Sequence, residues 1–407
     1  MTPEEIIEWR RFHDMLAATT PNPISKPADP PLSPSKKPDA KDGDTPKASS
    51  SRRTVASLQP ASAATTFPVL ESQCEQSSRT SGRSSPSKRM AALELYSEGV
   101  ESRVLSLTDP NLPAPLAELL VELEKCSLGV GVISSDLRAE IDEQAKQNPS
   151  LCIYLDYMFA DSADRDRIGP TPSLTDVAIL VEEAEECQAA MQSEAGWNAM
   201  VHYPLLYKAI YGQRRQNQLV GFSLCTTAKV IREYLPVHSL AKMVDFCVCV
   251  HPDVDKIAFE AIKSLRLELP FNVINHTDFL PLRGRPIAIS IGTKRRYSEH
   301  LATAELQLGT WHAAQWRLLE DLVTRCGGSF DGLPFLPAII VHGHYWSFAA
   351  TTRQQQTTVL WLEKCFGSTS SLLGVYRTVW GLQRLAKWVA EVYWPWFRKN
   401  ALGVSTG

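Results

Sequence analysis

No apolar stretch of this sequence is long enough to cross a membrane. A transmembrane helix needs about 20 consecutive apolar residues, and no uninterrupted apolar run among the 407 residues approaches that length. The first residues, MTPEEIIEWRRFHDML, carry acids where a secretory signal would be basic. We therefore expect an intracellular protein with no membrane partner, and the sequence leaves the nucleus and the cytoplasm open.

Cysteine is sparse, and no two cysteines have the CxxC spacing. The nine cysteines are scattered along the chain, without the CxxC pairs of a zinc site or the density of a disulfide scaffold. We expect them to be reduced, which agrees with an intracellular location.

An overall basic excess is also missing. The chain has 42 Lys and Arg against 45 Asp and Glu, a formal net charge of −3. This balance excludes a protein that coats nucleic acid through its total charge, so a nucleic-acid contact needs a local patch. One basic cluster consists of Arg283, Arg285, Lys294, Arg295 and Arg296. This cluster is consistent with phosphate binding, and it is equally consistent with an ordinary solvated face.

The N-terminal part divides into two segments by composition. Residues 1–18 place Ile6, Trp9, Phe12 and Leu16 at helical spacing among charges, which predicts a short amphipathic helix able to bind a protein partner or to dock back. In residues 19–90, 33 of 72 positions are Pro, Ser or Thr and Phe67 is the only aromatic residue. Such a segment cannot bury a core, and we expect a disordered linker.

The remainder contains the folded core. Nine of the ten tryptophans lie at or after Trp197, and tryptophan contributes most to stability where its large surface is buried. We expect a helical lead-in over residues 91–193, a core over residues 194–397 and a C-terminal tail over residues 398–407.

Apolar spacing predicts the elements of both parts. In the lead-in we expect helices at residues 93–107, 115–125, 137–147 and 178–192. In the core, a helix with Glu194 is followed by strands at 219–225, 242–250 and 286–294, a long helix at 300–324, strands at 338–350 and 358–362, and a helix at 372–392. This order predicts an α/β fold with a mixed sheet.

One carboxylate lies within an otherwise apolar strand. Alternation along residues 242–250 places Asp245 on the same face as Cys247 and Cys249. Because an unpaired buried carboxylate costs several kcal/mol, Asp245 should meet a metal ion, a lysine or several hydrogen-bond donors. A strand-end acid paired with a lysine or arginine is the plainer alternative.

The next expected strand ends in a lysine. Ser290, Gly292 and Lys294 share one face of residues 286–294, while isoleucines occupy the other. A carboxylate and a lysine on neighbouring strands suit phosphodiester hydrolysis, in which carboxylates hold a divalent ion and the lysine orients water or offsets phosphate charge. On the following helix, Gln307 and Trp311 lie one turn apart on the same face.

The order Asp, then Thr-Lys, then Gln-Leu-x-x-aromatic resembles the PD-(D/E)XK nuclease superfamily, in particular its RecB-like branch. Four longer motifs resemble its fungal nuclease-like domain family: Lys242-Met-Val-Asp-Phe-Cys, Asn275-His-Thr-Asp-Phe, Leu306-Gln-Leu-Gly-Thr-Trp and Tyr393-Trp-Pro-Trp-Phe. The resemblance covers residues 91–397. It implies a restriction-endonuclease-like mixed sheet flanked by helices, with Asp245 as a ligand of Mg²⁺ or Mn²⁺, Lys294 and Gln307 in catalytic positions, and Glu194 as an acid from the upstream helix.

The chain departs from the superfamily at one position. The resemblance places an acid two residues before Lys294, where this sequence has Gly292. Asp278 precedes Gly292 by 14 residues, a spacing that also suits the superfamily's leading Asp, and it is our second candidate metal ligand; Glu299 lies in an expected turn and is able to swing in, whereas Glu305 should point away from Gln307. With fewer carboxylates we expect weakened metal affinity.

These observations predict a nuclease-like protein that binds DNA, with metal-dependent phosphodiester hydrolysis impaired at Gly292. The alternative is a catalytically inactive module of the same fold that binds nucleic acid or a protein, because fold and activity separate readily.

Overall fold

A computed structural model of the chain describes residues 85–213, 218–236, 244–295 and 301–404. They fall within one compact unit, Ser84–Gly407. The expected N-terminal helix, almost all of the expected linker, and the candidate residues Arg296 and Glu299 lie outside the described residues. Among the described residues, no helix has both the length and the apolar character needed to cross a membrane.

Seven strands form one mixed sheet in the order β1-β9-β8-β7-β6-β5-β4. The strands are β1 (Val100–Val104), β4 (Val220–Leu224), β5 (Phe246–Val250), β6 (Ile287–Lys294), β7 (Leu336–His342), β8 (Tyr345–Gln354) and β9 (Thr357–Ser368). β1 pairs with β9 in parallel and β6 pairs with β7 in parallel, whereas the other neighbours are antiparallel. A separate parallel pair joins β2 (Ile133–Ser134) to β3 (Phe159–Ala160).

The helices pack on the two faces of this sheet. The helices are α2 (Pro86–Leu93), α3 (Ala114–Ser127), α4 (Arg138–Ala145), α5 (Ser162–Asp166), α6 (Leu174–Ala189), α7 (Glu194–Trp197), α8 (Tyr203–Tyr211), α9 (Lys256–Leu265), α10 (Leu301–Cys326), α11 (Leu372–Trp388) and α12 (Trp394–Asn400). A π-helical turn, η4 (Asn198–His202), joins α7 to α8, and another, η9 (Val389–Tyr393), joins α11 to α12.

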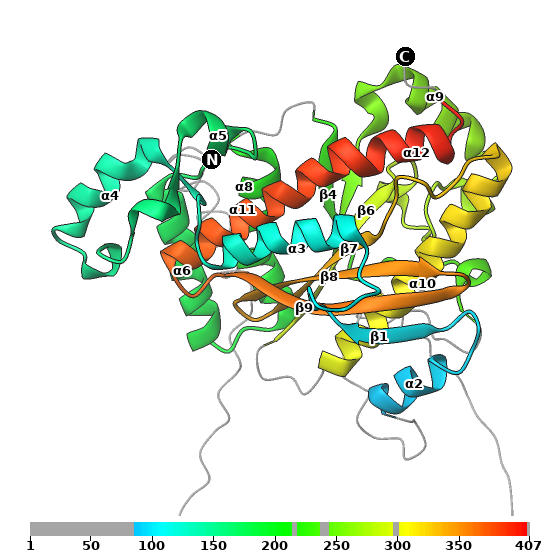
Figure 1. The fold of residues 1–407 in the computed structure, drawn as a ribbon, viewed down its shortest axis with the longest axis horizontal. Coiled ribbons are helices and arrows are strands. Elements are labelled where there is room, and N and C mark those ends of the chain that lie inside the picture. Colours follow the sequence, from blue (N-terminus) through cyan, green and yellow to red (C-terminus); the bar gives the residue numbers. More distant parts are fainter. Residues whose placement is uncertain (1–84, 214–217, 237–243, 296–300, 405–407) are drawn as a thin grey trace, which may run out of the picture. The chain divides into compact units, whose positions relative to one another are not determined.

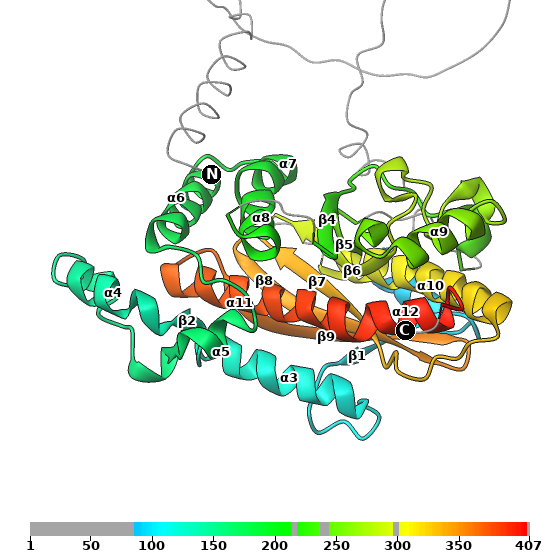
Figure 2. The same cartoon turned by 90° about the horizontal axis from the view of Figure 1, so that it is seen from above.

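Alternate residues of β7 belong to different cores, because successive side chains of a strand point to opposite faces. Ala338 and Ile340 pack with residues of α2 and α10. Ile339 and Val341 belong to the larger core that includes α3 and α11. Figures 1 and 2 show the same division, with α11 and α3 along one face and α10 on the other.

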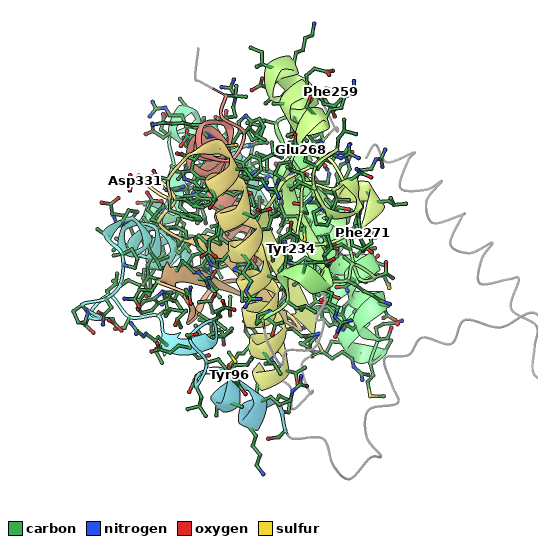
Figure 3. The ribbon with its side chains drawn as sticks, turned by 90° about the vertical axis from the view of Figure 1, so that its right-hand side faces the viewer. Tyr96, Tyr234, Phe259, Glu268, Phe271 and Asp331 are labelled. Atoms are coloured by element: carbon green, nitrogen blue, oxygen red, sulfur yellow. The ribbon has the colours of Figure 1, made fainter. Side chains whose placement is uncertain are left out.

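The α10 face is also crossed by a segment that follows β4. Figure 3, which looks onto α10, shows Tyr234 beside this helix and Tyr96 next to α2. Arg317 of α10 donates to the carbonyl of Leu235, and Ile231 N donates to His276 O at 2.9 Å. These bonds hold the loop containing Asn275 and His276 against the sheet.

The lead-in differs from its predicted helical character. The helix expected at residues 93–107 is wrong in its second half, because Val100–Val104 forms β1 and extends the main sheet beside β9. Helix α2 begins at Pro86, so the last residues of the expected linker are helical. The helices predicted at 115–125, 137–147 and 178–192 correspond to α3, α4 and α6, whereas α5 was not predicted.

Two features of the core, a β-hairpin and a helix, were not predicted from the sequence. The single strand expected at residues 338–350 is wrong, because the chain turns at Gly343 and His344 and forms the hairpin β7–β8. Helix α9 was not expected. At the C-terminus, α12 continues through Asn400, which is buried, so the expected tail begins with helix rather than with free chain.

Candidate active site

Asp245 lies at the point where β5 begins, one residue before the strand that was expected to contain it. Its backbone N–H donates to Ile291 O at 2.9 Å, and its carbonyl accepts from Cys225 N at 2.8 Å. These bonds tie its backbone to β6 on one side and to the end of β4 on the other. The backbone from which the carboxylate extends is therefore fixed at the beginning of β5.

The side chain of Asp245 accepts two kinds of hydrogen bond. The amide of Thr293 donates to its Oδ2 at 2.7 Å. The side chain of Asn198 also donates to it. Burial raises the pKa of Asp245, and the opposing effects of Lys294, Thr293 and Asn198 only reduce this rise. An incoming positive charge would stabilise this carboxylate.

Lys294 bridges backbone and carboxylate at the end of β6. Its Nζ donates to Thr293 O at 2.6 Å and forms an ion pair with Glu194 Oε2 at 3.3 Å. Its side chain is only 14% exposed. Burial raises the pKa of Glu194, Lys294 lowers it, and Asp245 raises it further. Two carboxylates thus lie close enough for their charges to interact, and the Lys294 ammonium lowers the pKa of both.

The segment before α8 brings Glu194 and Asn198 to the sheet. Ser193 caps α7, since its Oγ accepts from Gly196 N at 3.2 Å. Glu194 and Asn198 are four residues apart and so face the same side of this helical segment. Asn198 was not predicted as a site residue, although its spacing from Glu194 was the signal that could have identified it.

Helix α10 positions Gln307 by its register against β6. Gln315 Nε2 donates to Ile287 O at 2.8 Å, and Trp311 Nε1 donates to Ser290 Oγ at 3.0 Å. The helix therefore runs antiparallel to β6, and Gln307, one turn before Trp311, lies toward the Lys294 end of the strand. Its side chain is half-buried.

Gly292 lies beside open space. A Cβ built on this residue would meet nothing within 4 Å. No close packing contact of the described residues therefore requires glycine here, and a Cβ fits at this position.

The other candidate acids make no contact with this arrangement within the described residues. Asp278 is exposed, one residue after the bridge between Val230 and Thr277. Burial raises the pKa of Glu305 of α10, and the charge of Glu363 of β9 raises it further. Within the described residues, no three His, Cys, Asp or Glu side chains are grouped so that they could hold a metal ion.

The oxygen donors of this site are of the kind that a hard divalent cation prefers, but there are too few carboxylates among them. Oxygen ligands suit Mg²⁺ and Mn²⁺, and the raised pKa values of Asp245 and Glu194 show that negative charge here is not fully compensated. Asp245 and Glu194 would hold such an ion. The position of Gly292 supplies no ligand.

Fold and site together define an α/β protein whose mixed sheet carries a carboxylate and a lysine at the ends of two adjacent strands. The family model of the PD-(D/E)XK nuclease superfamily matches residues 141–394. This is more than half of the chain, and the chain belongs to this superfamily, with its restriction-endonuclease-like fold. Comparisons with curated proteins and with solved structures found no match.

Proposed function

We propose that this protein is a metal-dependent DNA nuclease with impaired phosphodiester hydrolysis. The observation that carries the proposal is the juxtaposition of Asp245, the Thr293 amide and Lys294 beside the open space at Gly292. This juxtaposition supports a nuclease site that lacks one acid. We also assign the chain, on its sequence motifs, to the RecB-like branch and the fungal type of the superfamily.

Each site residue has a definite role in this proposal. In this proposal Asp245 and Glu194 hold a Mg²⁺ or Mn²⁺ ion, and exposed Asp278 is a supporting ligand from the loop after the bridge between Val230 and Thr277. A divalent ion of this kind supplies charge stabilisation to the phosphoryl group and lowers the pKa of a bound water.

Two residues act on the substrate rather than on the ion. Lys294 offsets phosphate charge and orients water, because its ammonium lies at the end of β6 between two acceptors. Gln307 holds the site or the nucleic-acid backbone from α10. The described arginines near β6, Arg283, Arg285 and Arg295, are candidates for further phosphate contacts.

A second function is favoured by the missing acid itself. With glycine at position 292, the site is able to bind a phosphate through Lys294 without activating water. The chain would then be an inactive nuclease-fold module that binds nucleic acid or a protein partner, a role that the N-terminal amphipathic segment would also serve.

Calorimetric titration with MnCl₂, paired with a DNA cleavage assay, tests the proposal. We expect weak Mn²⁺ binding that disappears in Asp245→Ala and persists in Glu260→Ala, an exposed acid on α9. Slow cleavage lost in Asp245→Ala supports the impaired nuclease. Absence of Mn²⁺ binding at millimolar concentration, with DNA binding retained, contradicts it and supports the binding module.

A further inference from the structure

A ring of polar contacts runs around the candidate site. Asp245 accepts from the Thr293 amide and from the side chain of Asn198. Asn198 Oδ1 lies 2.9 Å from His202 Nδ1, and His202 Nε2 lies 3.4 Å from Gly343 O. Gly343 N donates to Lys294 O at 2.9 Å, and Lys294 follows Thr293 in the chain, which closes the ring.

The contacts that join Asp245, Asn198 and His202 have one consistent arrangement of donors and acceptors. An ionised carboxylate only accepts hydrogen bonds, so Asn198 must present its amide NH₂ to Asp245 and its carbonyl oxygen to His202. Burial lowers the pKa of His202 to about 4, and the neutral ring therefore carries a single proton. We assign that proton to Nδ1, which makes the shorter contact, at 2.9 Å, so that Nε2 faces Gly343 O without a proton.

The imidazole of His202 is held from three sides. It stacks on Trp197 with ring centroids 5.7 Å apart and meets the edge of Trp346 at 5.5 Å. Its side chain is 1% exposed. A histidine fixed in this way is able to fix the orientation of Asn198 in turn, as outer partners of metal ligands do.

The hairpin β7–β8 connects this histidine to the lysine side of the site. Gly343 has a positive φ of 58°, a conformation that favours glycine at the first residue of a two-residue turn. Its N–H and its carbonyl point to opposite partners, Lys294 and His202. One residue of the hairpin thereby contacts both halves of the site.

We propose that Asn198 and His202 are positioning residues that aim the Asp245 carboxylate at the open space beside Gly292. This inference rests on the proposed function, because it assigns the two residues to the cation-binding step of the same site. Neither residue touches the ion or the substrate. They act through Asp245, whose carboxylate is oriented by Asn198 together with the Thr293 amide at Oδ2.

Three variants and a control separate positioning from folding. Asn198→Leu and His202→Phe keep the size of the side chain and remove the hydrogen bond, whereas His202→Gln keeps a donor for Asn198. The control His312→Phe removes a buried histidine outside the ring, which bonds Thr351 Oγ1 at 2.8 Å. Each variant is measured for Mn²⁺ affinity by calorimetry and for thermal stability.

We expect Asn198→Leu and His202→Phe to weaken Mn²⁺ binding about 10-fold to 100-fold, the usual effect of losing an outer partner of a metal ligand. His202→Gln should restore most of the affinity, and His312→Phe should lower stability without changing affinity. Unchanged affinity in folded Asn198→Leu and His202→Phe, or no rescue by His202→Gln, would overturn the proposal.

A measurement that needs no metal keeps this inference distinct from the proposed function. The ¹⁵N spectrum of His202 in the wild-type chain should show the proton on Nδ1, and in Asn198→Leu it should move to Nε2, toward Gly343 O. A proton on Nε2 in the wild type overturns the positioning role even where Mn²⁺ binds. The expected shift supports the role even where wild-type Mn²⁺ binding fails and the proposed function falls.

Discussion

Lys294 forms an ion pair with Glu194, at 3.3 Å. Within the described residues it forms no ion pair with Asp245. The lysine nevertheless lowers the pKa of Asp245 from a distance. Asp245 is instead held by neutral donors, the Thr293 amide and Asn198. The two charged residues of adjacent strands therefore belong to one electrostatic group, and each has its own close partners.

The first prediction concerns the cost of removing Asp245. Asp245→Ala leaves the Thr293 amide and the Asn198 side chain without their acceptor, and each unsatisfied buried donor costs about 1–3 kcal/mol. We expect the free energy of unfolding to fall by about 3 kcal/mol, measured by urea denaturation. Lys294 keeps Glu194, so an unpaired lysine is not the cause. A loss much below 1 kcal/mol would show that water replaces the carboxylate.

The pH dependence of stability provides the second prediction. Burial raises the folded-state pKa of Asp245 above its ordinary value of about 4. The neutral form therefore stabilises the fold at low pH, and this contribution is lost as the pH rises through the raised value. Asp245→Asn, which remains neutral, should gain stability over the wild type as the pH increases from 4 to 8. A constant or shrinking difference in thermal midpoint would contradict the raised pKa.

Glu194 should matter more for the ion than for the fold. Its side chain is 38% exposed and its pKa is raised, so the ion pair with Lys294 only partly offsets its burial. We expect Glu194→Gln to change the free energy of unfolding by less than about 1 kcal/mol and to weaken Mn²⁺ binding. Glu260→Gln, which removes an exposed partner of Lys263, is the matched control and should change neither quantity. A large loss of stability in Glu194→Gln alone would make the residue structural.

The layer pattern of this fold could be predicted from local signals. Apolar runs located β4, β6 and α10 closely, because buried strands and a long amphipathic helix have strong periodicity. β1 was misassigned because its five residues, Val-Glu-Ser-Arg-Val, are mostly polar and become a strand only by pairing with β9. Such pairing joins segments more than 250 residues apart, so no local sequence pattern indicates it.

Site residues could be predicted where a single charged residue occurs in an otherwise apolar strand. Asp245 and Lys294 are charges at the ends of apolar strands, and the structure confirms that their strands are neighbours. Asn198 and His202 were not predictable as site residues, since they resemble any polar residue on a helix. Their role depends on Gly343, in a turn that the sequence pattern had merged into one strand.

A fourth prediction tests the turn at Gly343. Gly343→Ala introduces a Cβ at a φ of 58°, which costs about 1–2 kcal/mol. Gly327→Ala is the matched control, because Gly327 has a similar φ of 63° and lies in open space after α10. We expect similar losses in urea denaturation and a loss of Mn²⁺ affinity only in Gly343→Ala. Equal affinities in both variants would separate the hairpin from the site.

The last prediction addresses the acid that is missing at position 292. Gly292 lies on the face of β6 that also carries Lys294, and a new side chain there meets no atom within 4 Å of its Cβ. Gly292→Glu therefore adds a carboxylate to the side of the site where Asp245 and Glu194 already lie. Because each carboxylate increases the attraction for a divalent cation, Mn²⁺ and Mg²⁺ affinity should rise.

Gly292→Gln has nearly the same shape without the charge, so the pair isolates electrostatics from packing. We expect the Glu variant to bind Mn²⁺ more tightly by calorimetry and to cleave DNA faster than the wild type, and the Gln variant to do neither. Both should fold, since the open space accepts either side chain. Efficient wild-type cleavage that Asp245→Ala abolishes would mean that another group, such as Asp278, already replaces the missing acid. Equal unfolding of both variants would mean that the backbone at this strand position requires glycine for a reason other than space.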